Sequence, residues 1–310
     1  MSPKISILIP IYGVEAYIEQ CARSVFGQTY PNIEIIFIND GTPDRSMEIL
    51  RSLIKNEYNY LKDKIKIVEQ VNKGLPIARI TGLAEATGDY IFFVDSDDWI
   101  EPDSAECIAS CAARTNADMI HFGLYKEKGN RSVARIERDW SKKGKMEYIK
   151  ALYTRKTYGY LCLKCFKRSI YTSQPLFIPV KGMLEDICFA AQLIYRTESI
   201  CRLHKYLYHY RRTNPHALTR QKRSKKRLDS SINLMSMYRH YKDNLNDCPI
   251  QEAYRYILYY TAWNAIYYKL PLFEMFQELA DDVRHLSISG KNLFPLFKQI
   301  AARLYLGLKD

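Results

Sequence analysis

Short apolar segments alternate with longer amphipathic segments over the first 123 residues, and no other feature of the sequence restricts the fold as strongly. The apolar segments cover residues 5–10, 33–39, 65–70, 90–95 and 118–123, and the amphipathic ones cover 14–28, 44–60, 75–87 and 102–115. Strands that alternate with helices predict an α/β fold built on a mostly parallel sheet. The strands carry apolar residues on both faces, which is typical of a sheet that helices cover from both sides.

The pattern changes after about residue 124. A polar stretch rich in lysine and arginine comes first, and a region of mixed character follows it to about residue 222. Beyond that point the periodicity is helical, which predicts helices near 224–245, 250–269 and 291–308. We therefore expect a domain over residues 1–222, divided into halves after residue 123, and a helical region over 223–310.

Three aspartates lie at the end of the fourth apolar segment, where ligands of open α/β sheets bind. They are Asp95, Asp97 and Asp98, with Ser96 between the first two. Two like charges about 4 Å apart repel by roughly 4 kcal/mol at an effective dielectric constant near 20, and a divalent cation reverses the sign of that energy. Oxygen ligands favour Mg²⁺ or Mn²⁺. Capping of the helix expected at 102 is the alternative, and it accounts for one or two of the acids.

Polar residues also follow the second and third apolar segments. Asp40 is suited to a contact with a nucleotide base or ribose, although a capped turn before the next helix explains it equally well. In the third connection, Gly74 lets the backbone approach a ligand closely, and Arg79 is suited to pairing with a phosphate.

These segments together resemble the family 2 glycosyltransferases. The stretches SILIPIYG, FINDGTPD, NKGLPIAR and FFVDSDD match the family's motifs in order and spacing over about the first 115 residues, although Ile80 stands where an asparagine is usual. The resemblance implies the GT-A nucleotide-diphospho-sugar transferase fold, with the helical region as an appendage. It also implies transfer of a sugar from a nucleotide-sugar donor, a UDP-sugar above all, with Mn²⁺ or Mg²⁺ as cofactor. The acceptor is then a saccharide or a polyprenyl-diphosphate-linked oligosaccharide of a surface polysaccharide, such as a capsule or lipopolysaccharide.

The resemblance assigns a role to each matching position at the donor site. Asp40 matches the acid that binds the nucleotide base, and Asp97 matches the direct metal ligand. Asp95 is expected near the ribose or the water shell of the metal, and Arg79 near the donor phosphates. The other positions expected to contact the donor are Pro10, Tyr12, Lys73, Gly74 and Ser96.

A second pair of acids, Glu185 and Asp186, is the candidate for proton transfer. Inverting transfer needs a carboxylate that accepts the proton of the acceptor hydroxyl. The pair resembles the family's Gly-Glu-Asp segment, in which Asp186 matches the general base and Glu185 stands beside it. A favourable interaction with a helix dipole is the alternative explanation. Farther along, Arg211 and His216 lie in a segment that resembles the end of these catalytic domains, and we expect them to reach the leaving diphosphate or its metal.

Charge is divided unequally along the chain. Residues 1–123 carry 11 basic and 18 acidic side chains, for a net charge of −7, and the remainder carries 35 and 16, for +19. Six cations fall within residues 220–227, which favours attraction to anionic lipid. The amphipathic pattern of 291–308 supports the same expectation, although an ordinary packing helix explains that pattern at least as well.

The remaining alternatives are a basic nucleic-acid-binding protein and a non-catalytic scaffold of the same fold. The clustered acids argue against nucleic acid, and the complete set Asp40, Asp97 and Asp186 argues against the scaffold. The apolar run at the N-terminus is too short for a signal peptide or a membrane span. We therefore expect a cytoplasmic enzyme with peripheral contact at the inner face of the plasma membrane.

Overall fold

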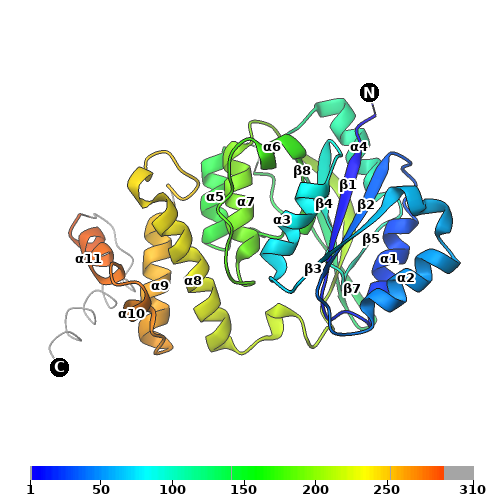
Figure 1. Ribbon diagram of the computed structural model, residues 1–310. Helices are drawn as coiled ribbons and strands as arrows, with labels where there is room; N and C mark the ends of the chain where they lie inside the picture. The colour runs from blue at the N-terminus through cyan, green and yellow to red at the C-terminus, as the bar shows by residue number, and fades with distance from the viewer. Residues whose placement is uncertain (1, 141, 252, 290–310) are drawn as a thin grey trace.

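The computed structural model describes residues 2–140, 142–251 and 253–289, in which one nine-stranded sheet is covered by helices on both faces (Figure 1). The strands are β1 Ile5–Ile11, β2 Ile33–Asp40, β3 Ile65–Gln70, β4 Tyr90–Phe93, β5 Trp99–Ile100, β6 Met119–Lys128, β7 Arg131–Arg135, β8 Lys164–Lys167 and β9 Ile200–Arg211. Their order is β3-β2-β1-β4-β8-β6-β9-β5. Strand β7 pairs with residues 124–128 of β6, beyond the part of β6 that pairs with β8. All five predicted apolar segments form strands, and the α/β class is confirmed.

The sheet has a parallel half and a mixed half. β1 pairs in parallel with β2 and β4, and β2 pairs in parallel with β3. β8 then inserts between β4 and β6 and is antiparallel to both, while β9 is parallel to β6. As a result, the carboxyl ends of β1, β2 and β4 lie at one edge of the sheet, which is the lower edge in Figure 1.

The helices of the first half are α1 Ile18–Phe26, α2 Ser46–Asn56, α3 Leu75–Glu85 and α4 Ser104–Thr115. Each lies inside a predicted amphipathic segment. α3 begins sharply because Gly74, at φ +85°, allows a chain reversal that a side chain would oppose, and Pro76 occupies the first turn.

The later helices are α5 Lys145–Tyr153, α6 Arg168–Thr172, α7 Glu185–Arg196, α8 Arg223–Tyr241, α9 Tyr254–Tyr267, α10 Leu272–Met275 and α11 Leu279–Ser289. Short 3₁₀ turns occur at Asn59–Lys64, Leu161–Leu163, Leu218–Arg220 and Lys242–Asn244. The two helices predicted near 224–245 and 250–269 are present as α8 and α9. The helix predicted over 291–308 lies outside the described residues. None of the helices within the described residues has both the length and the hydropathy that a membrane crossing requires.

Buried side chains form one core on each face of the sheet. α1, α2 and α4 cover one core, and α3, α5 and α7 cover the other. Leu234 of α8 and Leu258 of α9 belong to the same continuous core as Leu8 of β1. The boundary predicted after residue 222 coincides with the start of α8, yet the helices beyond it share a core with the sheet.

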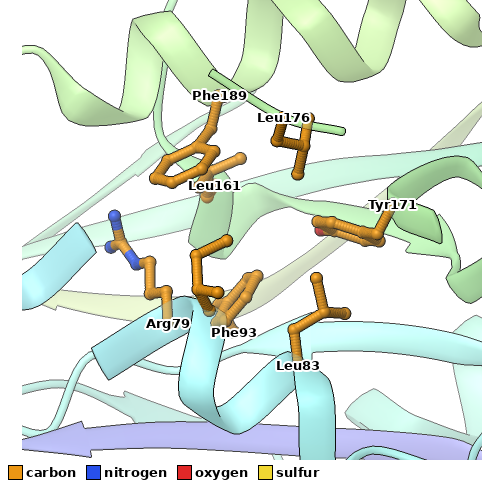
Figure 2. A pocket seen from close by; sticks show the side chains of 8 residues that line it. Arg79, Leu83, Phe93, Leu161, Tyr171, Leu176 and Phe189 are labelled. Atoms are coloured by element: carbon orange, nitrogen blue, oxygen red, sulfur yellow. The ribbon is translucent and has the colours of Figure 1, made fainter. Parts of the chain in front are cut away.

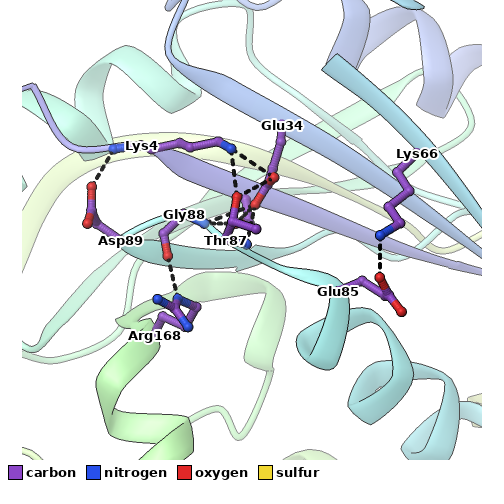
Figure 3. Close-up of polar contacts among 9 residues, drawn as sticks. Lys4, Glu34, Lys66, Glu85, Thr87, Gly88, Asp89 and Arg168 are labelled. Carbon is purple, nitrogen blue, oxygen red and sulfur yellow. Dashed lines mark hydrogen bonds and ion pairs between the residues drawn. The ribbon is translucent and has the colours of Figure 1, made fainter. Parts of the chain in front are cut away.

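At the amino ends of the strands, opposite the candidate site, Glu34 is the centre of a polar cluster (Figure 3). It accepts hydrogen bonds from the side chain of Ser6, from Lys4 Nζ at 2.9 Å and from the backbone N–H groups of Thr87 at 2.6 Å and Gly88 at 2.9 Å. Burial raises the pKa of Glu34, but these hydrogen bonds outweigh it and lower the pKa to about 2. The cluster joins β1, β2 and the start of β4.

Glu34→Gln should therefore flatten the dependence of stability on pH. Because the folded-state pKa lies below the ordinary value of 4.5, the stabilisation is complete above about pH 5 and is lost as the pH falls toward 2. The shift corresponds to at most about 3 kcal/mol of unfolding free energy at pH 7. Urea unfolding at pH 7 and pH 3 measures it. Glu48→Gln, which removes an exposed ion pair with Arg45, is the control, and equal pH dependence in the two variants would contradict the prediction.

Candidate active site

The predicted functional residues gather at the carboxyl edge of the parallel strands. Pro10 is the last residue but one of β1 and is buried, and the ring of Tyr12 just beyond the strand is exposed. Asp40 ends β2, and Asp95 follows β4 closely. The start of α7 and the end of β9 complete the edge, so residues far apart in sequence meet there.

The acidic turn after β4, Asp95 to Asp98, is held by β9. The buried Asp98 accepts hydrogen bonds from the Tyr208 hydroxyl at 2.7 Å and from the Arg211 backbone N–H at 2.7 Å. Asp97 accepts one from Asn214 Nδ2 at 2.8 Å. Strand β5 separates this turn from α4, which begins only at Ser104, so helix capping does not explain the three acids.

Burial makes the acidic turn electrostatically costly. It raises the pKa of Asp97 despite the hydrogen bond from Asn214, and it raises the pKa of Asp98 well above its ordinary value. The neighbouring carboxylates add to both shifts. Hard oxygen ligands gathered in this way fit Mn²⁺ or Mg²⁺. Across the described residues, however, no group of three or more histidine, cysteine or acidic side chains is arranged so that it could hold a metal ion by itself.

Two residues predicted near the metal or diphosphate lie beside the acidic turn. Arg211 donates from Nε to the backbone carbonyl oxygen of Asp97 at 2.7 Å, and its guanidinium carbon lies 4.9 Å and 4.7 Å from the ring centroids of Tyr17 and Trp99. Cation–π contacts with these two rings hold the side chain in place. The side chain of His216 is exposed, and only its backbone N–H is bonded toward the site, to Asn214 Oδ1. The contacts of both residues with a metal or diphosphate stay predictions.

Arg79 lies at the centre of the second acidic group. Its side chain is 2 % exposed and bonds Asp95 Oδ1 at 3.0 Å, Glu185 Oε1 at 3.1 Å and Asp186 Oδ1 at 2.6 Å. One guanidinium from α3 thus connects the acidic turn with the first turn of α7. Three carboxylates already engage it, so its predicted contact with the donor phosphates stays a prediction.

Apolar packing restricts the Arg79 side chain from the other side. Figure 2 shows Arg79 beside a small cavity lined by Leu83, Phe93, Leu161 and Phe189, with the guanidinium directed away from it. The cavity measures about 10 Å³, which is roughly the space that one water molecule needs. The guanidinium carbon is 5.7 Å from the centroid of the Phe93 ring. Packing therefore fixes the Arg79 side chain, and the fixed guanidinium in turn holds Asp95, Glu185 and Asp186 in place.

Glu185 and Asp186 occupy the first turn of α7, as predicted. Burial raises the pKa of both carboxyl groups, and that of Glu185 is raised well above its ordinary value. The Asp186 side chain is 22 % exposed and that of Glu185 is 7 % exposed, so Asp186 is the more accessible of the two acids. A raised pKa makes a carboxylate a stronger base, and Arg79 keeps it from rising further.

The segment before this pair is held by the C-terminal helices. Asn233 of α8 is buried and accepts a hydrogen bond from the Lys181 backbone N–H at 3.0 Å. It also donates to the backbone carbonyl oxygens of Lys181 at 2.7 Å and Met183 at 2.8 Å. The sequence offered no signal for this contact.

Asp40 organises the loop between β3 and α3. Its buried carboxylate accepts hydrogen bonds from Gln70 Nε2 at 2.6 Å and from the backbone N–H groups of Lys73 at 2.8 Å and Gly74 at 2.9 Å. Asp40 therefore stabilises a turn, as the alternative explanation expects, but the turn is the one before α3 and not the one before α2. A contact with the nucleotide base stays a prediction. The Lys73 side chain is exposed and Ser96 is buried.

Comparison with known proteins decides the family. The family model described as Glycosyl transferase family 2 matches residues 6–173. The chain belongs to this family. It is 34% identical to the glycosyltransferase EpsH of Bacillus subtilis (strain 168) over 215 residues, which are 68% of this chain and 61% of EpsH. The chain thus matches about three fifths of the length of that relative.

Solved structures show the GT-A fold of this family member. The crystal structure of S. aureus TarS 1-349 in complex with UDP-GlcNAc superposes with a TM-score of 0.65 at 18% identity, over 96% of this chain and 81% of that one. The mannosyltransferase PcManGT from Pyrobaculum calidifontis, in complex with GDP-Man and Mn²⁺, gives 0.56 at 15% identity, over 100% and 82%. The predicted family and fold are both confirmed.

Sequence reasoning missed the residues that hold the acids in place. Tyr208 and Asn214 lie in the segment predicted to reach the site, but roles were assigned there to Arg211 and His216 instead. The alternation of Tyr208 and Tyr210 along a strand was the available signal, since it places both rings on one face of β9.

Proposed function

We propose that this chain is an inverting glycosyltransferase that moves a sugar from a UDP-sugar to a saccharide or lipid-linked acceptor during surface polysaccharide synthesis. The observation that carries the proposal is the link through Arg79 between Asp95 of the acidic turn and Asp186 of α7. Asp95, Glu185 and Asp186 all contact Arg79, and this shared contact supports the proposal that the donor site and the base act together. Family membership and the nucleotide sugars in the TarS and PcManGT structures support it.

In the proposed reaction, the acceptor oxygen bonds to the anomeric carbon on the face opposite the diphosphate, and the bond from that carbon to the diphosphate oxygen breaks. Asp186 accepts the proton of the acceptor hydroxyl, and Arg79 holds that carboxylate in position. Asp97, with Asp95 nearby, would hold Mn²⁺ or Mg²⁺, which supplies positive charge to the leaving diphosphate when bound. The fit rests on the oxygen donors of the acidic turn, in which Asp97 is largely desolvated and lies near the carboxylate of Asp95.

Nucleotide-dependent thermal stabilisation tests the donor site. UDP with Mn²⁺ should raise the melting temperature of the wild type, by an amount equivalent to about 2.7 kcal/mol at a hundredfold excess over Kd. GDP, dTDP and CMP should raise it less. Asp97→Ala should abolish the response, whereas Asp63→Ala, which changes an exposed acid of a 3₁₀ turn, should retain it. Absence of any nucleotide response in the wild type would contradict the proposal and favour a non-catalytic scaffold.

We also propose that the protein works in the cytoplasm in peripheral contact with anionic lipid through residues 220–227. Lys222 and Lys225 are exposed, as this contact requires. Co-sedimentation with anionic but not with neutral vesicles is expected, and equal sedimentation with both would exclude the electrostatic contact.

A further inference from the structure

A second cavity lies between α8, α9 and the end of α5, and it shares no residue with the acidic site. It measures about 470 Å³, within the range of small-molecule sites. Three arginines, Arg155, Arg223 and Arg227, line it together with five aromatic residues from the segment 256–268. Two of the six cations of the 220–227 cluster therefore face this cavity.

The aromatic rings form one face of α9. Tyr256, Tyr260, Trp263 and Tyr267 recur at steps of three and four residues, and two pairs are stacked, Tyr256 on Tyr260 at 5.8 Å and Trp263 on Tyr267 at 5.2 Å. Leu258 and Ala262 of α9 are buried in the core, and Tyr256, Tyr260 and Trp263 pack against the same core while staying partly exposed. Tyr267 is 60% exposed. Because Tyr267 is exposed and the other three rings are only partly buried, core packing accounts for part of this concentration of rings but not for all of it.

The arginines are placed against the rings and have no acidic partner among the described residues. The Arg227 guanidinium carbon lies 5.4 Å from the Tyr260 ring centroid and 5.9 Å from that of Tyr268. Arg223 lies 5.6 Å from the Tyr268 ring and Arg155 lies 5.9 Å from the Tyr260 ring. Three like charges around one cavity repel each other, and a bound oxyanion would relieve that repulsion by charge-assisted hydrogen bonds.

We propose that this cavity binds an anionic sugar unit of a glycan, with the arginines paired to its carboxylate or phosphate and the aromatic rings packed against its sugar ring. The inference rests on the proposed function, since a glycosyltransferase meets a glycan as its acceptor. The position of the cavity relative to the acidic site supports the inference. Figure 1 shows the connection from β9 to α8 running along the edge at which β1 ends. Residues 212–222 join Arg211 at the acidic turn to Arg223 at the cavity, which limits their separation to about 45 Å.

Binding is measured by calorimetry with three oligosaccharides of equal length, namely a uronate oligomer, a phosphorylated maltooligosaccharide and neutral maltooligosaccharide, and with inorganic phosphate. At least one anionic oligosaccharide should bind more tightly than both the neutral one and phosphate. Arg223→Gln and Arg227→Gln should each weaken that binding roughly ten- to hundredfold. Lys225→Gln, which removes the same charge from an exposed position of α8 outside the cavity, should change it less than twofold.

Other outcomes overturn the inference. These are binding of neither anionic oligosaccharide, equal binding of the neutral one, equal binding of phosphate, and equal losses in Lys225→Gln and Arg223→Gln. Tighter binding of single-stranded DNA with the same arginine dependence would assign the cavity to nucleic acid instead. The melting temperature and its response to UDP and Mn²⁺ should be unchanged in Arg223→Gln, so that a failure of the donor site is recognised separately.

Discussion

Asp186→Asn is expected to lower kcat by roughly two to four orders of magnitude while leaving the fold and the nucleotide response intact. An amide cannot accept the proton of the acceptor hydroxyl, and general base catalysis contributes about that factor. Arg79 retains two carboxylate partners in the variant, Asp95 and Glu185, which keeps it in place. The measurement is the rate of UDP release from the sugar donor in the presence of acceptor.

The dependence of the reaction rate on pH tells whether Asp186 acts as the base or only has a structural role. Because burial raises the pKa of Asp186, the wild-type rate should rise with pH through that raised value, and this limb should be missing from the residual activity of Asp186→Asn. Glu185→Gln is the neighbouring control, because its side chain is less accessible, and it should retain the limb. A profile that keeps the limb in Asp186→Asn and loses it in Glu185→Gln would assign the base to Glu185.

Lys164→Met is expected to destabilise the fold by about 3–5 kcal/mol, because it leaves a buried carboxylate without its partner. Lys164 is fully buried and bonds Glu137 Oε1 at 3.2 Å and the backbone carbonyl oxygens of Tyr158 at 2.8 Å and Tyr160 at 3.2 Å. The other oxygen of Glu137 accepts a hydrogen bond from the Tyr148 hydroxyl at 2.9 Å. Urea unfolding at pH 7 gives the free energy.

Two further variants test whether the loss comes from the unpaired charge. Adding Glu137→Gln to Lys164→Met should recover part of the stability, since no buried ion then remains. Lys145→Met breaks an ion pair with the exposed Glu198 and should cost less than about 1 kcal/mol. A double variant less stable than the single one would show that packing of the lysine stem, and not its charge, stabilises this region.

Local periodicity made the parallel half of the sheet predictable, and pairing over long distances made the mixed half unpredictable. The buried strands of the first half carry their signal in consecutive apolar residues. Strand β8 is only four residues long, Lys164–Lys167, and its place between β4 and β6 depends on partners far away in sequence. Propensity does not encode such a register.

In the candidate site, too, features encoded by local motifs were predictable and contacts between distant residues were not. Motif order located Asp97 and Asp186 at the sheet edge because both follow recognisable segments. The link made by Arg79 joins positions 106 and 107 residues apart, so nothing in the local sequence around Arg79 could reveal it. The loop contact of Asp40 was likewise hidden, since its partners follow a different strand.

The hydrogen bonds of Asn233 limit how freely the C-terminal helices can be exchanged between relatives. This asparagine reaches from α8 to the backbone just before the acids of α7, and the apolar residues around it continue the core of the sheet. A chimera that joins residues 1–222 to another protein's helices would have to supply both the amide and a complementary apolar surface. Helices α8 and α9 are therefore a structural part of the catalytic unit and not an interchangeable module.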